Sequence, residues 1–464
     1  MGILQVIGVV LMFAILIFAI AKNFKPTMVL LLLGLVAITI MNLIKGTLPG
    51  GDSTSGNFVI DLFDVIRQTF SSQLGGTALI IICAMAFVGF MDHIKASSML
   101  CLIATKPLRH VKSPYLVVAA SLIIMACINI FVPSATGRAA LYLSTIFPIL
   151  LASGVTPATA ATTMMLGAVY ASIGPSATLP TLVLGLGEPG ISVPEHFLRF
   201  DLINQAILMV FLLPIFCIVQ SRFDKSDKLK GLSEGEGAIK VDVIDIKTLG
   251  IPKWFAIFPT VPLILCVIFS PLVIDWIPIT VPVALYIGFI FAFLCNLIFV
   301  KGDKKKLFNS GHVYFESVGE GLGTVGVMLI CASIFSAGVT QIGGLDVIIN
   351  SITGGTGEGV MVLVAGGAIT VMYFVCIIFT GVASANAAAF ATMMAGMASG
   401  SVYSKLASML VVGGGIGVAV SPISGVTILV SGRTGLGIPR LIKRILIPGV
   451  AGMVIAIIIA AIIH

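Results

Sequence analysis

The stretch Val132-Pro133-Ser134-Ala135-Thr136-Gly137-Arg138 interrupts a long apolar part of the chain, and it decides how the rest of the sequence is interpreted. Non-helical backbone inside a membrane persists only where protein or a water-filled cavity satisfies its hydrogen bonds. A short polar tip between two apolar arms therefore predicts a re-entrant hairpin over residues 114–153. A second polar, glycine-containing tip, Thr380–Asn386, predicts another hairpin over residues 359–400.

Two apolar helices are interrupted in a related way. The predicted helix 162–186 contains Gly174-Pro175-Ser176-Ala177-Thr178, and the predicted helix 406–432 contains Ser421-Pro422-Ile423-Ser424-Gly425. Proline removes an amide donor and clashes with the preceding turn, so each helix should unwind there and expose carbonyl groups. We therefore expect two broken helices beside the two hairpins.

The composition supports a membrane protein. Of the 464 residues, 58% are hydrophobic and only 10% are charged, which lies far outside the range of soluble domains. The apolar runs predict about ten full crossings in an all-α polytopic fold. The chain contains no GxxxxGK, HExxH or GxSxG motif, and its eight cysteines show no CxxC spacing. We therefore expect neither an enzyme nor a protein with a resident metal site.

The basic residues orient the predicted helices. Of the 26 Lys and Arg residues, all but Lys45, Arg67, Arg138, Arg199 and Lys405 fall on one side of the predicted topology. The positive-inside rule makes that side cytoplasmic, which places both termini in the periplasm of a bacterial inner membrane. This bias accounts for the net charge of +7 without a nucleic-acid partner. The first apolar run is expected to be a retained helix, not a cleaved signal.

The chain repeats itself at an offset of about 245 to 250 residues. Since each half contains an odd number of predicted crossings, the halves should be inverted repeats, here 1–221 and 254–464, joined by a cytoplasmic linker at 222–253. Helices in 1–45 and 254–300 would form the scaffold. The matching positions are Gly76-Thr77 with Gly323-Thr324, Cys83 with Cys331, Ser134-Ala135-Thr136 with Ser384-Ala385-Asn386, Pro175 with Pro422, and Pro194 with Pro439.

Two amphipathic stretches, the Asp92-His93 pair and Arg138 each allow more than one interpretation. The amphipathic stretches 58–71 and 306–319 predict helices on the membrane surface or simple interfacial loops. Asp92-His93 is either a proton relay or an interfacial helix end. No other carboxylate is expected deep in a span. Arg138 follows a hairpin tip. It either clamps a substrate carboxylate, or it points down a cytoplasmic vestibule or caps hairpin carbonyls.

The breaks and tips together predict a binding site. Free carbonyls and hydroxyl oxygens can coordinate a cation, whereas amides at half-helix starts favour an anion. The coupling ion is therefore expected near Gly174, Pro175, Ser176, Thr380, Gly381, Ser421 and Pro422.

Four segments also resemble a known family. They are Ser113-Pro114-Tyr115-Leu116, Pro133-Ser134-Ala135-Thr136-Gly137, Thr145-Ile146-Phe147-Pro148 and Ser421-Pro422-Ile423-Ser424-Gly425-Val426-Thr427. The chain thereby resembles the anaerobic C4-dicarboxylate carriers of the DcuC family, which are related to the divalent-anion/sodium symporters. The resemblance covers nearly the whole chain. It implies an elevator-type homodimer whose hairpin tips and broken helices bind substrate: Ser134, Ala135, Thr136, Gly137, Arg138, Ser176, Thr178, Ser384, Ala385, Asn386, Ser424 and Thr427.

The resemblance also implies a function. The expected substrate is a small C4-dicarboxylate such as succinate, fumarate, malate or aspartate, moved by ion-coupled transport or exchange with no cofactor except a coupling Na⁺ or H⁺. The tips read Ser-Ala-Thr and Ser-Ala-Asn, where the symporters favour Ser-Asn-Thr, so the resemblance leaves Na⁺ coupling open. The alternatives are a carrier for another organic anion or amino acid, an ion antiporter of the same fold, or a channel.

Overall fold

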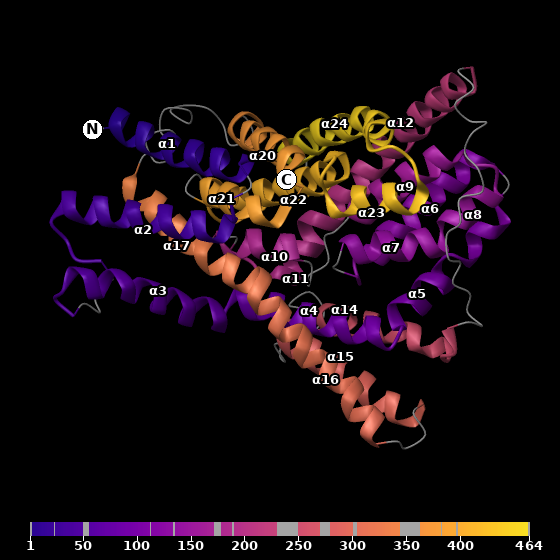
Figure 1. The fold of residues 1–464 in the computed structure, drawn as a ribbon, viewed down its shortest axis with the longest axis horizontal. Helices are drawn as coiled ribbons and strands as arrows, with labels where there is room; N and C mark the ends of the chain where they lie inside the picture. The colour runs from indigo at the N-terminus through magenta and orange to yellow at the C-terminus, as the bar shows by residue number, and fades with distance from the viewer. Residues whose placement is uncertain are drawn as a thin grey trace.

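The computed structural model describes residues 2–22, 24–49, 55–111, 113–132, 135–170, 178–187, 190–229, 249–269, 279–299, 304–343, 362–381, 383–395 and 398–462. The regular structure in these segments is helical, and they contain no strand. Figure 1 shows the helices packed side by side at varied angles. The predicted all-α fold is thus confirmed for the described residues.

The first half of the chain builds its helices from strong local signals. Pro26, Pro114 and Pro157 each occupy the first turn of a helix, where a missing amide costs no hydrogen bond. The helices are α1 (Gly2–Ala21), α2 (Pro26–Lys45), α3 (Phe58–Gly75), α4 (Thr77–His93), α5 (Ala96–Ala104), η1 (Lys106–His110), α6 (Pro114–Asn129), α7 (Ala135–Thr145), α8 (Phe147–Ala152), α9 (Pro157–Val169), α10 (Thr178–Gly185), α11 (Val193–His196), η2 (Phe197–Asp201) and α12 (Leu202–Leu229).

The second half follows a similar order of elements. A pair of apolar helices comes first, followed by a long amphipathic-to-apolar rod, a hairpin, an interrupted helix and a final long helix. The helices are η3 (Lys253–Thr260), α14 (Val261–Ile268), α15 (Val281–Phe299), α16 (Lys304–Gly321), η4 (Leu322–Gly326), α17 (Val327–Ile342), η5 (Val362–Gly366), α20 (Gly367–Thr380), α21 (Ala383–Ala395), α22 (Gly400–Val420), α23 (Gly425–Thr434) and α24 (Ile438–Ile462).

Several helices are long and apolar enough to cross a membrane. Among the described residues there are six such helices, or seven if α3 and α4, which meet at a bend of 51°, form one broken span. Shorter apolar helices accompany them, including Pro114–Asn129 and Val327–Ile342. The chain is therefore a multi-pass membrane protein, while the larger number of crossings expected from the sequence stays a prediction.

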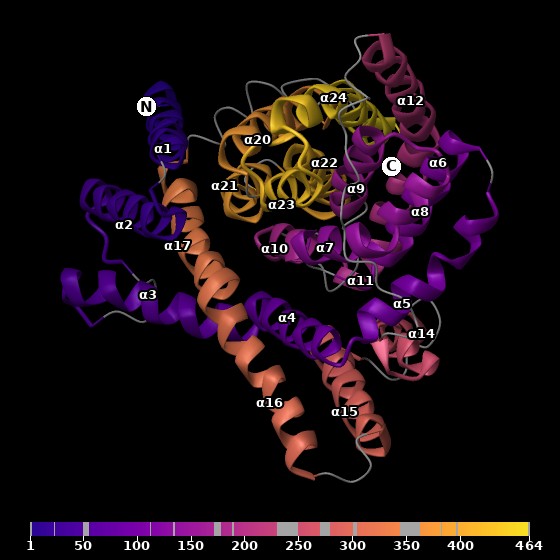
Figure 2. The ribbon, with the colours of Figure 1, turned by 45° about the vertical axis from the view of Figure 1, so that its right-hand side comes forward.

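One group of helices consists of α2 to α4 with α15 to α17. Helix α17 packs along α2, and α16 packs along α4. Figure 2 shows α16 and α17 as one long rod that crosses α3 and α4, with α16 pointing away from α20 to α24 and α17 packing against α21. The predicted amphipathic stretches form α3 and α16, which expose apolar side chains such as Phe63 and Phe315.

A second group gathers α6 to α12 with α20 to α24. Helix α24 packs against both α12 and α22, and α9 lies among α6, α7 and α22. Three boundaries differ from those expected. Helix α9 begins at Pro157 and α22 at Gly400, earlier than predicted, and α12 continues through Leu229 into the expected linker.

The extension of α12 carries a buried ion cluster. Arg444 of α24 is 1% exposed and bridges two carboxylates, with Nη1 2.8 Å from Asp224 Oδ1 and Nη2 2.7 Å from Asp227 Oδ2. Thr159 Oγ1 and Tyr115 Oη each lie 2.9 Å from Asp224 Oδ2. Asp224 and Asp227 thus lie in the part of α12 beyond residue 221, which the sequence assigns to the linker.

Breaking this cluster should weaken the fold. Removing one partner of a buried ion pair leaves the other charge uncompensated, which typically costs about 3–5 kcal/mol. We expect Arg444→Met to lower the unfolding free energy by that order in detergent or nanodiscs. The matched change Arg440→Met removes a more exposed partner of Asp227 and should cost about 1 kcal/mol or less. Equal losses in the two variants would contradict this account.

Candidate functional site

The second interrupted helix has a short break that is held by buried hydrogen bonds. Helix α22 ends at Val420 and α23 begins at Gly425. Ser424 caps α23, since its Oγ accepts the Thr427 amide at 3.2 Å and donates to Thr427 Oγ1 at 3.0 Å. Ser421 Oγ donates to the Ile378 carbonyl of α20 at 3.0 Å. These three hydroxyl side chains are fully buried, so the break is a defined structure that is tied to the second hairpin.

The tip of the second hairpin contacts this break through its backbone. Gly381 ends α20 with a φ of 72°, a left-handed conformation that favours glycine. A methyl group at this position would lie 2.9 Å from the Ile423 carbonyl oxygen and 3.0 Å from the Ser424 nitrogen. Both the backbone conformation and the close approach therefore require glycine here.

The first hairpin is attached to the end of α9 by buried polar side chains. Asn129 Nδ2 donates to the Gly167 carbonyl at 2.6 Å and also to the Tyr170 carbonyl. Tyr142 Oη lies 2.7 Å from Asn129 Oδ1. Because the last carbonyls of a helix lack partners within it, these donors satisfy the C-terminus of α9 where the helix stops.

Arg138 contributes to the same attachment. Its Nε donates to the Ala168 carbonyl at 2.7 Å, its Nη1 donates to the Val132 carbonyl, and the side chain is 0% exposed. Of the two interpretations of Arg138, these bonds match the capping of carbonyls. The guanidinium also places a positive charge at the negative end of the α9 dipole, which is favourable.

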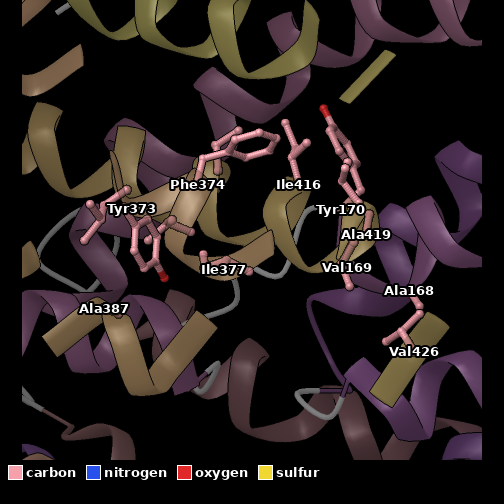
Figure 3. Packing of buried hydrophobic residues seen from close by; sticks show 14 of the residues in the cluster. Ala168, Val169, Tyr170, Tyr373, Phe374, Ile377, Ala387, Ile416, Ala419 and Val426 are labelled. Carbon is pink, nitrogen blue, oxygen red and sulfur yellow. The ribbon is translucent and has the colours of Figure 1, made fainter. Parts of the chain in front are cut away.

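The end of α9 lies against α22 near the middle of the molecule. A methyl group at Gly415 would lie 2.8 Å from the Val169 carbonyl oxygen. Figure 3 shows Val169 and Tyr170 beside Ile416 and Ala419 of α22 in a continuous apolar core. The two interrupted helices therefore cross where the first one ends.

The tip of the first hairpin reaches the start of α23. Thr136 Oγ1 lies 3.1 Å from the position of a methyl group at Gly425. Thr136 and Gly137 are both exposed, although the next residue is fully buried. Thus α7 and α23, which come from different halves of the chain, begin beside each other, and α10 and α21 also pack together. Helix starts carry partial positive charge and free amide groups, so this convergence favours an anion.

A cavity of about 240 Å³ lies beside the first hairpin. The hairpin contributes the tip residue Gly137 and the α7 residue Ser144, and the last turn of α4 contributes Asp92. Its other lining residues are Ser97, Ser98, Val132, Ala140 and Leu141. The cavity is large enough for a four-carbon acid. Of the Asp92-His93 pair, only Asp92 is among these lining residues.

The structure brings some of the predicted site residues together and leaves others apart or outside the described residues. Thr136, Gly381, Ser421, Ser424 and Thr427 meet around the start of α23, as described above. Asn386 is buried in α21, and Pro422 lies in the break. For four further residues the structure describes the helical backbone but not the side chain: Thr178, Thr380, Ser384 and Ala385. Outside the described residues lie Ser134, Gly174, Pro175 and Ser176.

Sequence reasoning missed Asn129 and Tyr142. Both are polar side chains in apolar hairpin arms, which was the available signal. Asn129, however, bonds to the end of α9, a separate helix later in the chain, and Tyr142 bonds to Asn129. It also did not anticipate a buried pair of His196 and Asp201 near the start of α12. Among the described residues, no three or more His, Cys, Asp or Glu side chains form a group that could hold a metal ion.

Hairpins and interrupted helices meeting inside an apolar helical bundle define a membrane-transporter type of fold. The crystal structure of the Alcanivorax borkumensis YdaH transporter shares this fold with a TM-score of 0.61 and 14% identity, covering 95% of this chain and 98% of that one. The Neisseria gonorrhoeae protein MtrF, from a class of antimetabolite efflux pumps, has a TM-score of 0.54 and 14% identity, with 96% of each chain covered.

The family follows from the sequence comparisons. Residues 4–464 match the family described as "DcuC: C4-dicarboxylate anaerobic carrier", and the chain belongs to this family. It is 25% identical to a probable anaerobic C4-dicarboxylate transporter DcuC of Vibrio cholerae, over 97% of this chain and 96% of that protein. It is 26% identical to the Escherichia coli transporter DcuC, over 95% and 92% of the two chains.

The contacts of Arg138 lead to a stability prediction. Arg138→Met would keep the apolar stem but leave the Ala168 and Val132 carbonyls without these donors, and each buried unpaired group costs about 1–3 kcal/mol. We expect a clear fall in the unfolding midpoint, measured without substrate. Arg67→Met, at an exposed position, serves as the control. An unchanged midpoint together with a raised KM for substrate would instead identify Arg138 as a direct carboxylate clamp.

Proposed function

We propose that this chain is a secondary active transporter of C4-dicarboxylates such as succinate, fumarate, malate or aspartate. The observation that carries the proposal is the meeting of the first hairpin tip with the start of α23, at Thr136 and Gly425. An anion placed there faces the positive ends of helices and an exposed hydroxyl. Membership of the DcuC family favours a dicarboxylate as that anion.

We further propose a division of labour among the site residues. The amides at the starts of α7, α21 and α23 and the Thr136 hydroxyl bind the carboxylates. Ser424 and Thr427 hold the start of α23 in shape, because their side chains already bond to each other and to its first turn. Arg138 fixes the tip, and its charge adds to the positive potential. The coupling ion, Na⁺ or H⁺, binds near the break at Ser421 and Pro422, and for Na⁺ the backbone carbonyls of the break are the ligands.

The mechanism we propose is elevator-type alternating access between two inverted repeats. Reciprocal packing of α7 with α23 and of α10 with α21 is what such repeats would produce around a shared site. In this proposal α1 to α4 and α14 to α17 form the scaffold of a homodimer in the inner membrane, with both termini periplasmic. The group α6 to α12 with α20 to α24 moves as the carrier.

The membrane potential constrains the direction of transport. Moving one charge across 100 mV involves about 2.3 kcal/mol, and a dianion entering a negative cell therefore faces about twice that amount. Uptake consequently requires co-transported cations or exchange for another dianion, whereas the field favours efflux of a dianion.

The proposed substrate class can be tested in proteoliposomes. Vesicles loaded with unlabelled succinate should accumulate labelled succinate by saturable counterflow. Fumarate, malate or aspartate should compete, while the monocarboxylate butyrate should not, because it lacks the second charge. No counterflow with any of these C4-dicarboxylates would refute the proposal, and flux that does not saturate would indicate a channel.

The tip hydroxyl offers a sharper test. We expect Thr136→Val to raise the KM for succinate roughly tenfold or more, since a hydrogen bond to a charged group contributes about 1.5–3 kcal/mol. The exposed residue Thr340 at the end of α17 provides the control Thr340→Val, which should leave KM unchanged. A wild-type KM in the Thr136 variant would remove this hydroxyl from the binding site.

A further inference from the structure

A buried polar pair lies at the start of α12, well away from the hairpin tips. His196 Nδ1 lies 3.3 Å from Asp201 Oδ2, and His196 Nε2 lies 3.1 Å from the Ser404 carbonyl oxygen of α22. Asp201 Oδ1 accepts the Ser408 hydroxyl at 2.6 Å. The two titratable side chains are 0% and 2% exposed. The pair therefore ties α11 and η2, at the start of α12, to the first turns of α22.

The partners of the two ring nitrogens indicate how many protons the pair holds. A carbonyl oxygen only accepts hydrogen bonds, so Nε2 must carry a hydrogen. The other ring nitrogen faces a carboxylate, and that contact needs a hydrogen as well, supplied either by Nδ1 or by a protonated Asp201. In both cases the pair holds one proton more than a neutral histidine beside an ionised aspartate.

Loss of that proton would weaken the contact. Each neutral tautomer of His196, beside ionised Asp201, leaves one ring nitrogen without a hydrogen against an acceptor. Either the Ser404 carbonyl or Asp201 Oδ2 would then face a lone pair inside the protein, where an unsatisfied polar group is costly. Deprotonation therefore disfavours the packing of η2 on α22.

A similar cluster, built around Arg444, lies at the opposite end of the carrier group. It contains no histidine. Thr159 in the first turns of α9 occupies the position that Ser404 has in α22, at the repeat offset seen in the sequence. There the cation is Arg444, which binds Thr159 and Asp224, and a guanidinium holds its proton more tightly than an imidazole does. Of the two clusters, the one at the start of α12 contains an imidazole, the side chain whose ordinary pKa lies near physiological pH.

Other charged groups lie on the adjoining turns. Glu195 and Arg199 form an ion pair of 3.0 Å with each other on α11 and η2. Lys405 and Tyr403 lie on α22, both buried, and Tyr403 Oη donates to the Val183 carbonyl of α10. Phe200 stacks on the His196 ring at a centroid distance of 5.2 Å.

We propose that His196 and Asp201 form a proton-binding site that controls transport from the extracytoplasmic side. A proton from water at that face binds the pair and returns to water there, so no other reactant is needed. With the proton bound, α12 and α22 stay joined and the carrier group moves as one unit. This inference rests on the proposed function for its transport readout and on the predicted topology for the side of the membrane.

The variant Asp201→Asn tests the site directly. Its amide can donate to Nδ1 of a neutral His196 and its oxygen can still accept from Ser408, so the contact no longer needs the extra proton. In right-side-out vesicles, wild-type succinate exchange should fall several-fold, on the order of tenfold, as external pH rises from about 6 to 8.5. The Asp201→Asn protein should keep the wild-type rate of pH 6 throughout.

Two further proteins complete the experiment. His312→Gln changes an exposed histidine of α16 and should keep the wild-type pH profile. His196→Gln should show no pH dependence over the same range, because it lacks the titrating ring. A wild-type pH profile in the Asp201→Asn or His196→Gln protein would overturn the proposal.

A stability measurement separates this inference from the proposed substrate. The unfolding midpoint of the wild-type protein in nanodiscs should fall with rising pH more steeply than that of the Asp201→Asn protein, because the protonated pair stabilises the fold only while it keeps its proton. If this difference appears while no dicarboxylate is exchanged, the proposed function fails and the proton site stands. Parallel midpoints for the two proteins would refute the proton site.

Discussion

The interrupted helices of this protein depend on finding hydrogen-bond partners for backbone that stops being helical within an apolar bundle. Water is scarce there, and each unpaired carbonyl or amide would be costly. The end of α9 is satisfied by Asn129 and Arg138 from the first hairpin, and Ser421 at the end of α22 bonds to the second hairpin. The same bonds that permit the breaks therefore hold the hairpins beside them.

This requirement explains why the candidate site is both rigid and partly open. The donors that satisfy the helix ends are fully buried, whereas the adjoining tip residues Thr136 and Gly137 remain exposed. The start of α23, from the other half of the chain, meets this exposed tip at the start of α7, which concentrates positive potential without a large number of charged side chains. Such a site suits a small anion that must be released as well as bound.

Two buried polar clusters, one at each end of α12, also connect the interrupted helices to neighbouring helices. One joins the end of α12 to α9 and α24 through Arg444, and the other joins the start of α12 to α22 through His196. Both interrupted helices are thereby fastened near their first turns as well as at their breaks. The clusters differ in one chemical respect, because a guanidinium keeps its proton and an imidazole exchanges it.

The sequence by itself determined the all-α membrane fold and the break at Ser421-Pro422, because apolar runs, proline and small polar residues act locally along the chain. Only the tertiary structure decided the partners: which helix end Asn129 and Arg138 satisfy, and that Thr136 meets Gly425 from the other half. Arg444 illustrates the limit. The sequence places it among the basic residues of the predicted cytoplasmic side, but its burial arises only when α12 and α24 pack, and no local pattern encodes that contact.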